Sequence, residues 1–118
     1  MTLYILNTLI VPIDYDKVDA AAIISYRIDL KTARERVKKA LQRGELQSAV
    51  GHEGTAQLLS RLLGVEIKAE RRTIFLQKGD EALHFFLKQR LPEGTVLSEE
   101  ELQKLPFWFV WSEVRDAK

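Results

Sequence analysis

A histidine between two glycines stands where a helix is predicted to begin: His52 lies between Gly51 and Gly54. The start of a helix leaves backbone N–H groups without partners and carries the positive end of the helix dipole, so it attracts phosphate or carboxylate groups. Glycines keep side chains away from such an anion, and a histidine side chain can gain or lose a proton near neutral pH. This combination predicts chemistry on a phosphate ester. A plain helix cap or surface residue is the alternative interpretation of His52.

A second group of polar residues, Gln89, Arg90 and Glu93, falls at the end of a predicted strand and in the turn that follows it. The planar guanidinium of Arg90 suits a phosphate, and the carboxylate of Glu93 can orient a histidine, a ribose hydroxyl or that arginine. An ordinary turn is the alternative interpretation.

A third cation is expected beside this group through strand pairing. Residues 73–76 and 82–91 both have strand character, and the Gly-containing segment 78–80 between them is typical of a hairpin turn. Antiparallel pairing would bring Arg71, which precedes the first strand, towards Arg90. We therefore expect two guanidinium groups to converge.

The remaining elements follow from periodicity, caps and breakers. Asp29 is the expected N-cap of the first helix, Gly44 its stop, and Gly64 the end of the second helix; Asn7 falls near the far end of the first strand. In chain order we expect a buried strand over residues 3–11, a half-exposed strand over 24–28, helices from 30 and over 52–63, the hairpin, a short helix with a capping box at Ser98, and a last strand over 107–114. This order predicts an α/β or α+β fold in which a mixed sheet of about five strands is packed by helices.

Composition limits the class of protein. With 118 residues, 46% hydrophobic and 30% charged, residues 1–118 should form one domain. The absence of cysteine excludes disulfides, thiolate zinc sites and cysteine nucleophiles, and it suits a reducing compartment. No apolar run approaches the roughly 20 residues of a membrane span, and the first residues lack the features of a secretory signal, so we expect a soluble, cytoplasmic protein. The net charge of +1 requires that any anionic ligand be held by a local group of cations.

Several familiar chemistries lack their motifs. His52 and His84 are far apart in the sequence and no carboxylate completes a metal-binding spacing, so neither a metal nor another cofactor is predicted. His84, flanked by Leu83 and Phe85, is expected to be a packed or edge residue. Phosphate-binding and dinucleotide-binding glycine patterns are absent, and the two helices lack helix-turn-helix spacing.

Three segments, residues 51–59, 79–82 and 89–94, resemble those of the viral anti-CRISPR ring nucleases, a family that is also found in prophages and bacterial genomes. The likeness extends over nearly the whole chain and is most specific in the first and last of these segments. Members of that family are homodimers that bind cyclic tetraadenylate, the second messenger of type III CRISPR defence, and cut it into linear products without a metal. The resemblance therefore implies a homodimer, this substrate and a metal-independent reaction.

The resemblance also implies roles for individual residues. In the implied reaction, a 2′-hydroxyl of the ring attacks its own phosphate, and protonated His52 donates to the departing oxygen, which leaves a 2′,3′-cyclic phosphate. Relatives commonly have serine at the position of Gly54 and a polar residue at that of Pro92. The site expected from the resemblance comprises His52 and Glu93 as catalytic residues, with Asn7, Gly51, Thr55, Arg71, Gln89 and Arg90 binding the substrate.

Two other functions use the same residues differently. A module that senses or sequesters a cyclic oligonucleotide would share the phosphate-binding groups but would not cut the ring. A small interaction protein that blocks a host partner through its aromatic C-terminal strand would use His52 only as a helix cap.

Overall fold

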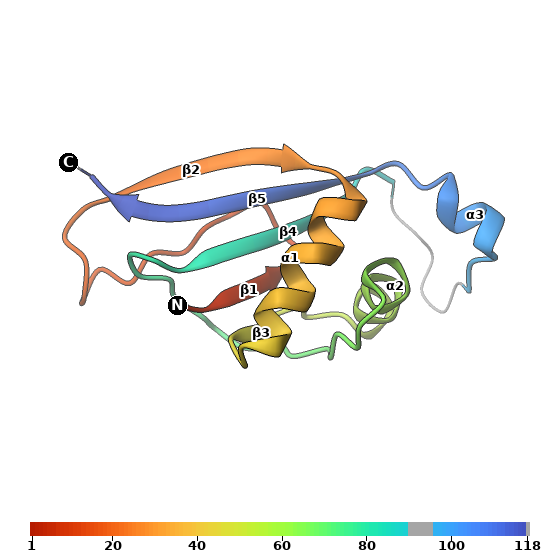
Figure 1. Cartoon of the computed structure of the whole chain (residues 1–118), viewed down its shortest axis with the longest axis horizontal. Coiled ribbons are helices and arrows are strands. Elements are labelled where there is room, and N and C mark those ends of the chain that lie inside the picture. Colours follow the sequence, from red (N-terminus) through yellow and green to blue (C-terminus); the bar gives the residue numbers. More distant parts are fainter. Residues whose placement is uncertain (90–95, 118) are drawn as a thin grey trace.

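The computed structural model describes residues 1–89 and 96–117. In this part of the chain five strands and three helices follow one another in the order ββαβαβαβ (Figure 1). Their bounds are β1 Leu3–Leu6, β2 Ala21–Ile28, α1 Leu30–Gln42, β3 Leu46–Ser48, α2 Glu53–Leu63, β4 Glu81–Leu87, α3 Glu99–Gln103 and β5 Phe107–Asp116.

The strands form one mixed sheet in the order β2-β5-β4-β1-β3. β1 is parallel to both of its neighbours, β3 and β4, whereas β5 is antiparallel to β4 and β2. The expected single α+β domain with a mixed five-stranded sheet is confirmed within the described residues. None of the helices in this part of the chain combines the length and the apolar character that crossing a membrane requires.

Two apolar layers cover the sheet. On one face, Ala33, Val37 and Ala40 of α1 and most of the apolar residues of α2 pack on alternate residues of β1, β4 and β5. Figure 1 shows both helices against this face. On the other face, residues from the segment between β1 and β2, together with Leu76, cover a smaller cluster that includes Leu6 and Val114.

Local signals placed the helices correctly. Asp29 caps α1 through a 2.8 Å bond from the Thr32 N–H to Oδ1. Gly64 ends α2 in the left-handed region at φ 71°, a conformation that costs glycine little. Ser98 and Glu101 form the expected capping box of α3.

Two predictions about strands were wrong. The first strand ends at Leu6 rather than at residue 11, because the chain bends there and crosses to the second face, where Ile13 packs. Residues 73–76 form no hairpin with β4 either: Leu76 makes only an isolated parallel bridge to Ile13, and β4 pairs with β1 and β5. The sequence analysis also missed β3, a strand of three residues.

Candidate functional site

The three parallel strands end at one edge of the sheet, here called the carboxyl edge. β1 lies between β3 and β4, so the residues that follow all three strands leave the sheet on the same side. Beyond the end of β3, the Ala49 N–H donates to the carbonyl of Ile5 over 2.9 Å. This bond joins the segment after β3 to β1, so Asn7 and Gly51 follow neighbouring segments of the chain at the carboxyl edge. Ligands of open α/β sheets commonly bind at such an edge.

His52 occupies the N-cap of α2, with an extended backbone and an exposed side chain. The ring makes no hydrogen bond to the first turn of the helix. The other two helices of the described chain do have such bonds, from Asp29 and from Ser98. The first-turn N–H groups of α2 therefore face water or a bound anion, and His52 stands beside them.

Arg71 reaches the same place by a route that the sequence analysis did not foresee. Val50 forms an isolated parallel β-bridge with Ala69, and the Val50 carbonyl accepts from the Glu70 N–H over 2.8 Å. Arg71 comes next along the chain and lies against Gly51: a Cβ built on Gly51 would be 3.8 Å from Arg71 Nε. Within residues 1–89 and 96–117 the exposed Arg71 side chain forms no hydrogen bond or ion pair. The Arg71 guanidinium thus lies beside Gly51, the residue that precedes the N-cap of α2, with no partner in this part of the chain.

The neighbouring cation has a different, structural role. Arg72 donates from Nε to the Ser48 carbonyl over 3.2 Å and from Nη2 to Gln47 Oε1 over 2.8 Å. Its Nε also lies 3.8 Å from a carboxylate oxygen of Glu70. These contacts fasten the segment after α2 to β3, and they distinguish Arg72 from Arg71.

The first turn of α2 has room for a ligand. A Cβ built on Gly54 would meet nothing within 4 Å, and one on Gly51 would make only ordinary contact with Arg71. Thr55 is half-buried at the third position of the helix. The carboxylate of Glu53 accepts from Gln57 Nε2 over 3.5 Å, one helical turn further along.

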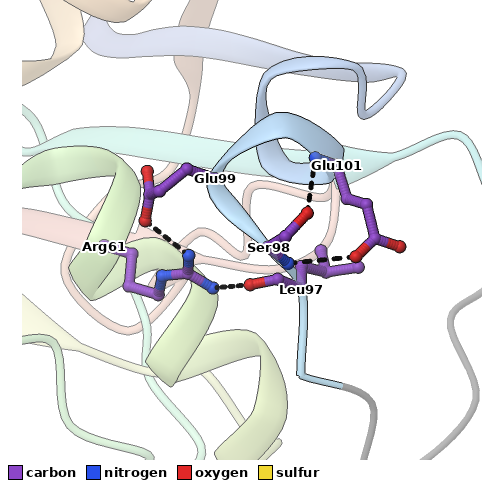
Figure 2. A network of polar contacts seen from close by, with 5 residues as sticks. All are labelled: Arg61, Leu97, Ser98, Glu99 and Glu101. Atoms are coloured by element: carbon purple, nitrogen blue, oxygen red, sulfur yellow. Dashed lines mark hydrogen bonds and ion pairs between the residues drawn. The ribbon is translucent and has the colours of Figure 1, made fainter.

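The second predicted group is described only at its borders. Gln89 is exposed just after β4, at the carboxyl edge, whereas Arg90 and Glu93 lie outside the described residues. Downstream, Arg61 of α2 anchors the chain by donating to the Leu97 carbonyl over 2.8 Å and by pairing with Glu99 over 2.6 Å (Figure 2). The pairing of Arg71 with Arg90 through a hairpin is wrong, since residues 71–75 form no strand.

His84 is fully buried at the middle of β4, which confirms the expectation of a packed residue. Burial lowers its pKa, and the hydrogen bond to the Thr8 carbonyl partly offsets that effect. Its other partner, Ser112, was missed by the sequence analysis. The available signal was a lone serine in the apolar run of β5.

Metal ligands are not gathered anywhere in the described part of the chain: no three His, Asp or Glu side chains there lie close enough together to hold an ion.

Comparison with known proteins identifies relatives along most of the chain. A family model described as STIV B116-like matches residues 3–109. An uncharacterized protein, ORF117 of Acidianus two-tailed virus, is 39% identical over 110 residues, which cover 91% of this chain and 88% of the relative. An uncharacterized protein of a Sulfolobus islandicus filamentous virus is also 39% identical, over 107 residues, covering 89% of this chain and 85% of the relative.

A bacterial protein and a viral protein of known structure are also similar to this chain. The uncharacterized protein YddF of Bacillus subtilis is 36% identical over 81 residues, covering 67% of this chain and 75% of YddF. B116 of Sulfolobus turreted icosahedral virus has the same fold, with a TM-score of 0.81 at 25% identity, over 96% of this chain and 99% of B116.

Proposed function

The chain belongs to the STIV B116-like family, and on this premise we propose that it is a ring nuclease, an enzyme that binds cyclic tetraadenylate and cleaves it without a metal. The observation that carries the proposal is the uncapped start of α2, where His52 and the guanidinium of Arg71, which has no partner among residues 1–89 and 96–117, flank Gly51. Backbone N–H groups, a cation and a proton donor at one point are what cleavage of a phosphodiester requires.

In the proposed reaction the ring supplies its own nucleophile. A 2′-hydroxyl attacks the adjacent phosphorus, the bond from phosphorus to the 5′-oxygen breaks, and a linear product with a 2′,3′-cyclic phosphate results. Protonated His52 gives its proton to the departing 5′-oxygen, and the proton of the attacking hydroxyl passes to a general base, for which Glu93 is our candidate. Arg71 and the first-turn N–H groups of α2 stabilise the negative charge on the phosphate in the transition state.

The other residues of the proposed site bind the nucleotides around the cleaved bond. Asn7 and Gln89 follow β1 and β4 at the carboxyl edge, and Thr55 lies in the first turn of α2. Arg90 is assigned to a second phosphate by the resemblance of residues 89–94.

A homodimer completes the proposal, because one copy of the proposed site assigns only Arg71 and Arg90 to a ring with four phosphates, and a two-fold axis doubles them. We assign the interface to an apolar patch on the sheet face opposite the helices: Phe86 stacks on Trp108 with ring centroids 5.5 Å apart, and Val110 follows on the same face of β5. Phe86 is 37% exposed. Leu6 and His84 are the last pair between β1 and β4, so Phe86 lies beyond that pair on the way to the carboxyl edge, and a two-fold axis at this patch would bring two carboxyl edges together.

The viral origin of two relatives indicates a biological role for the proposed activity. Proteins similar along nearly the whole length occur in viruses of Acidianus and Sulfolobus, and destroying a messenger of host antiviral defence benefits a virus. We therefore assign the protein to antagonism of type III CRISPR signalling.

The decisive experiment incubates the protein with labelled cyclic tetraadenylate in excess chelator and identifies the products by mass. We expect linear products that end in a 2′,3′-cyclic phosphate. An intact ring that still raises the melting temperature would replace cleavage by sequestration, and a ring that neither binds nor breaks would refute the proposal in favour of an interaction protein.

Two adjacent arginines provide a matched control for the site. Arg71→Ala should weaken binding of the ring by about tenfold, as expected for losing a charged contact to phosphate. Arg72→Ala removes the same charge one residue away, but Arg72 is held by Ser48 and Gln47, so its effect should be several-fold smaller. Equal losses in the two variants would mean that only overall charge matters.

A further inference from the structure

A continuous series of hydrogen bonds crosses the sheet from the outer strand β2 to the segment that follows β1. In β4, the buried His84 has Nδ1 2.6 Å from the carbonyl oxygen of Thr8 and Nε2 2.8 Å from the hydroxyl of Ser112 in β5. The Ser112 hydroxyl is in turn 2.7 Å from that of Ser25 in β2. His84 and Ser112 are 0% and 1% exposed, respectively, and Ser25 is exposed at the outer strand.

Chemistry fixes the direction of every bond in this series. A carbonyl oxygen can only accept, so Nδ1 of His84 must carry the hydrogen that points to Thr8. In the neutral ring Nε2 is then the acceptor, which makes Ser112 the donor to it and Ser25 the donor to Ser112. The Thr8 carbonyl thereby fixes the Nδ1–H tautomer of His84, and the Ser112 hydroxyl, which can donate or accept, turns to donate to Nε2.

The Thr8 carbonyl lies beyond the end of β1, where strand pairing no longer fixes the backbone. β1 ends at Leu6, so Thr8 is two residues beyond the last paired position. From there the chain turns towards Leu9 and Ile10, which are 44% and 71% exposed. The Nδ1–H of His84 therefore ties this turn to the rigid centre of the sheet.

We propose that His84, in the Nδ1–H tautomer that the Thr8 carbonyl requires, is a positioning residue of the substrate site: its bond to that carbonyl sets the direction in which Asn7 and Thr8 face along the carboxyl edge. The inference rests on the proposed function, because the segment that it positions leaves the sheet at the same carboxyl edge as Gly51 and the start of α2. A group held in place before the ligand arrives loses less freedom on binding, so removing the bond should weaken binding rather than slow the chemical step.

Two near-isosteric substitutions separate the two nitrogens of the ring. In His84→Asn the amide nitrogen can take the place of Nδ1 and keep the donor to Thr8, whereas in His84→Gln it can take the place of Nε2 and keep only the contact with Ser112. Both variants remove ring atoms from the buried core and should lower the melting temperature.

Asp80→Ala is the control for destabilisation alone. Asp80 is 5% exposed and accepts from the N–H groups of Thr2 and Gln77, at the opposite end of β1 and β4. Its loss should lower the melting temperature without disturbing the turn after β1.

Steady-state cleavage of cyclic tetraadenylate by the four proteins tests the proposal. We expect KM to rise about tenfold in His84→Gln, the worth of one lost interaction, with kcat within about threefold of wild type because His52 is untouched. His84→Asn and Asp80→Ala should keep KM within about threefold of wild type.

Each outcome decides a different point. Equal KM values in His84→Gln and His84→Asn, or a rise of the same size in Asp80→Ala, would overturn the inference while the proposed function stands. A wild-type protein that does not act on the ring would overturn the proposed function itself. If the histidine variants do not fold, Ser112→Ala removes only the partner of Nε2 and leaves the Nδ1–H donor to Thr8. It should keep KM within about threefold of wild type and the ¹⁵N resonances of His84 in the Nδ1–H form. A KM raised by about tenfold while Nδ1 stays protonated, or an unchanged KM after Nδ1–H is lost, would overturn the inference.

Discussion

Replacing His52 by asparagine should make the protein more stable and lower its rate of ring cleavage. The backbone at His52 is extended, with φ −127° and ψ 128°, as an N-cap residue requires, but its side chain forms no cap bond. Asparagine is among the most favourable N-cap residues, since its side-chain oxygen accepts from the N–H of the second or third helical residue. In α2 these residues are Gly54 and Thr55.

The expected sizes follow from this geometry. A new cap adds about 1 kcal/mol to the free energy of unfolding, which raises the melting temperature of a domain of this length by about 4 °C. The exposed ring of His52 makes no bond to the helix, so little stability is lost with it. Loss of the general acid should lower the rate of ring cleavage by about 100-fold or more. The asparagine oxygen also occupies the N–H groups that would bind phosphate, so KM should rise as well.

His52→Ala separates the two effects. It removes the proton donor without adding a cap, so the free energy of unfolding should stay within about 0.5 kcal/mol of wild type, binding should persist and the rate should fall. Urea unfolding and product analysis on the three proteins measure both quantities. Wild-type turnover in His52→Ala would remove the general-acid role. A loss of more than about 1 kcal/mol in the same variant would show that the ring supports the helix, as a plain cap would.

Two further predictions concern stability. Because burial lowers the pKa of His84, the unfolded chain takes up a proton near pH 6.5 that the folded chain does not. The contribution of His84 to the free energy of unfolding should therefore be fully present above about pH 7 and fall below pH 6.5, by at most about 1.4 kcal/mol per pH unit. In His84→Asn, the free energy of unfolding measured with urea should depend less steeply on pH over the same range. Gly54→Ala should raise the free energy of unfolding by about 0.5 kcal/mol, since a helical glycine is replaced where a Cβ meets nothing within 4 Å; a drop in melting temperature would mean that this space is needed by the fold.

Features encoded within a few residues could be predicted from the sequence. The cap at Asp29, the stop at Gly64 and the capping box at Ser98 each involve neighbours three or four positions apart, and all three occur as expected. The start of α2 belongs to the same class, because one contiguous stretch supplies the N-cap, the glycines and the N–H groups. This is why His52 could be singled out before any pairing of strands was known.

Features that depend on register could not be predicted in this way. The turn before β4 is real: Gly79 has φ 93° and the Asp80 N–H donates to the Gln77 carbonyl over 3.0 Å. However, the residues before it do not continue as a strand, because Leu76 is buried in the second apolar cluster. A correct local turn was therefore joined to the wrong partner.

Arg71 lies at the expected edge of the sheet although the strand pairing that was expected to bring it there does not form. The sequence placed Arg71 near phosphate through a hairpin that does not exist, yet the chain brings it to Gly51 through the bridge at Val50. Both routes end at the carboxyl edge because β1 lies between β3 and β4 and is parallel to both, so that segments following all three strands converge there. Parallel order thus fixes where polar groups can gather, whereas the identity of the group that faces a ligand depends on single contacts, such as the one between His84 and Thr8. Those contacts join residues distant in sequence, and only the three-dimensional structure reveals them.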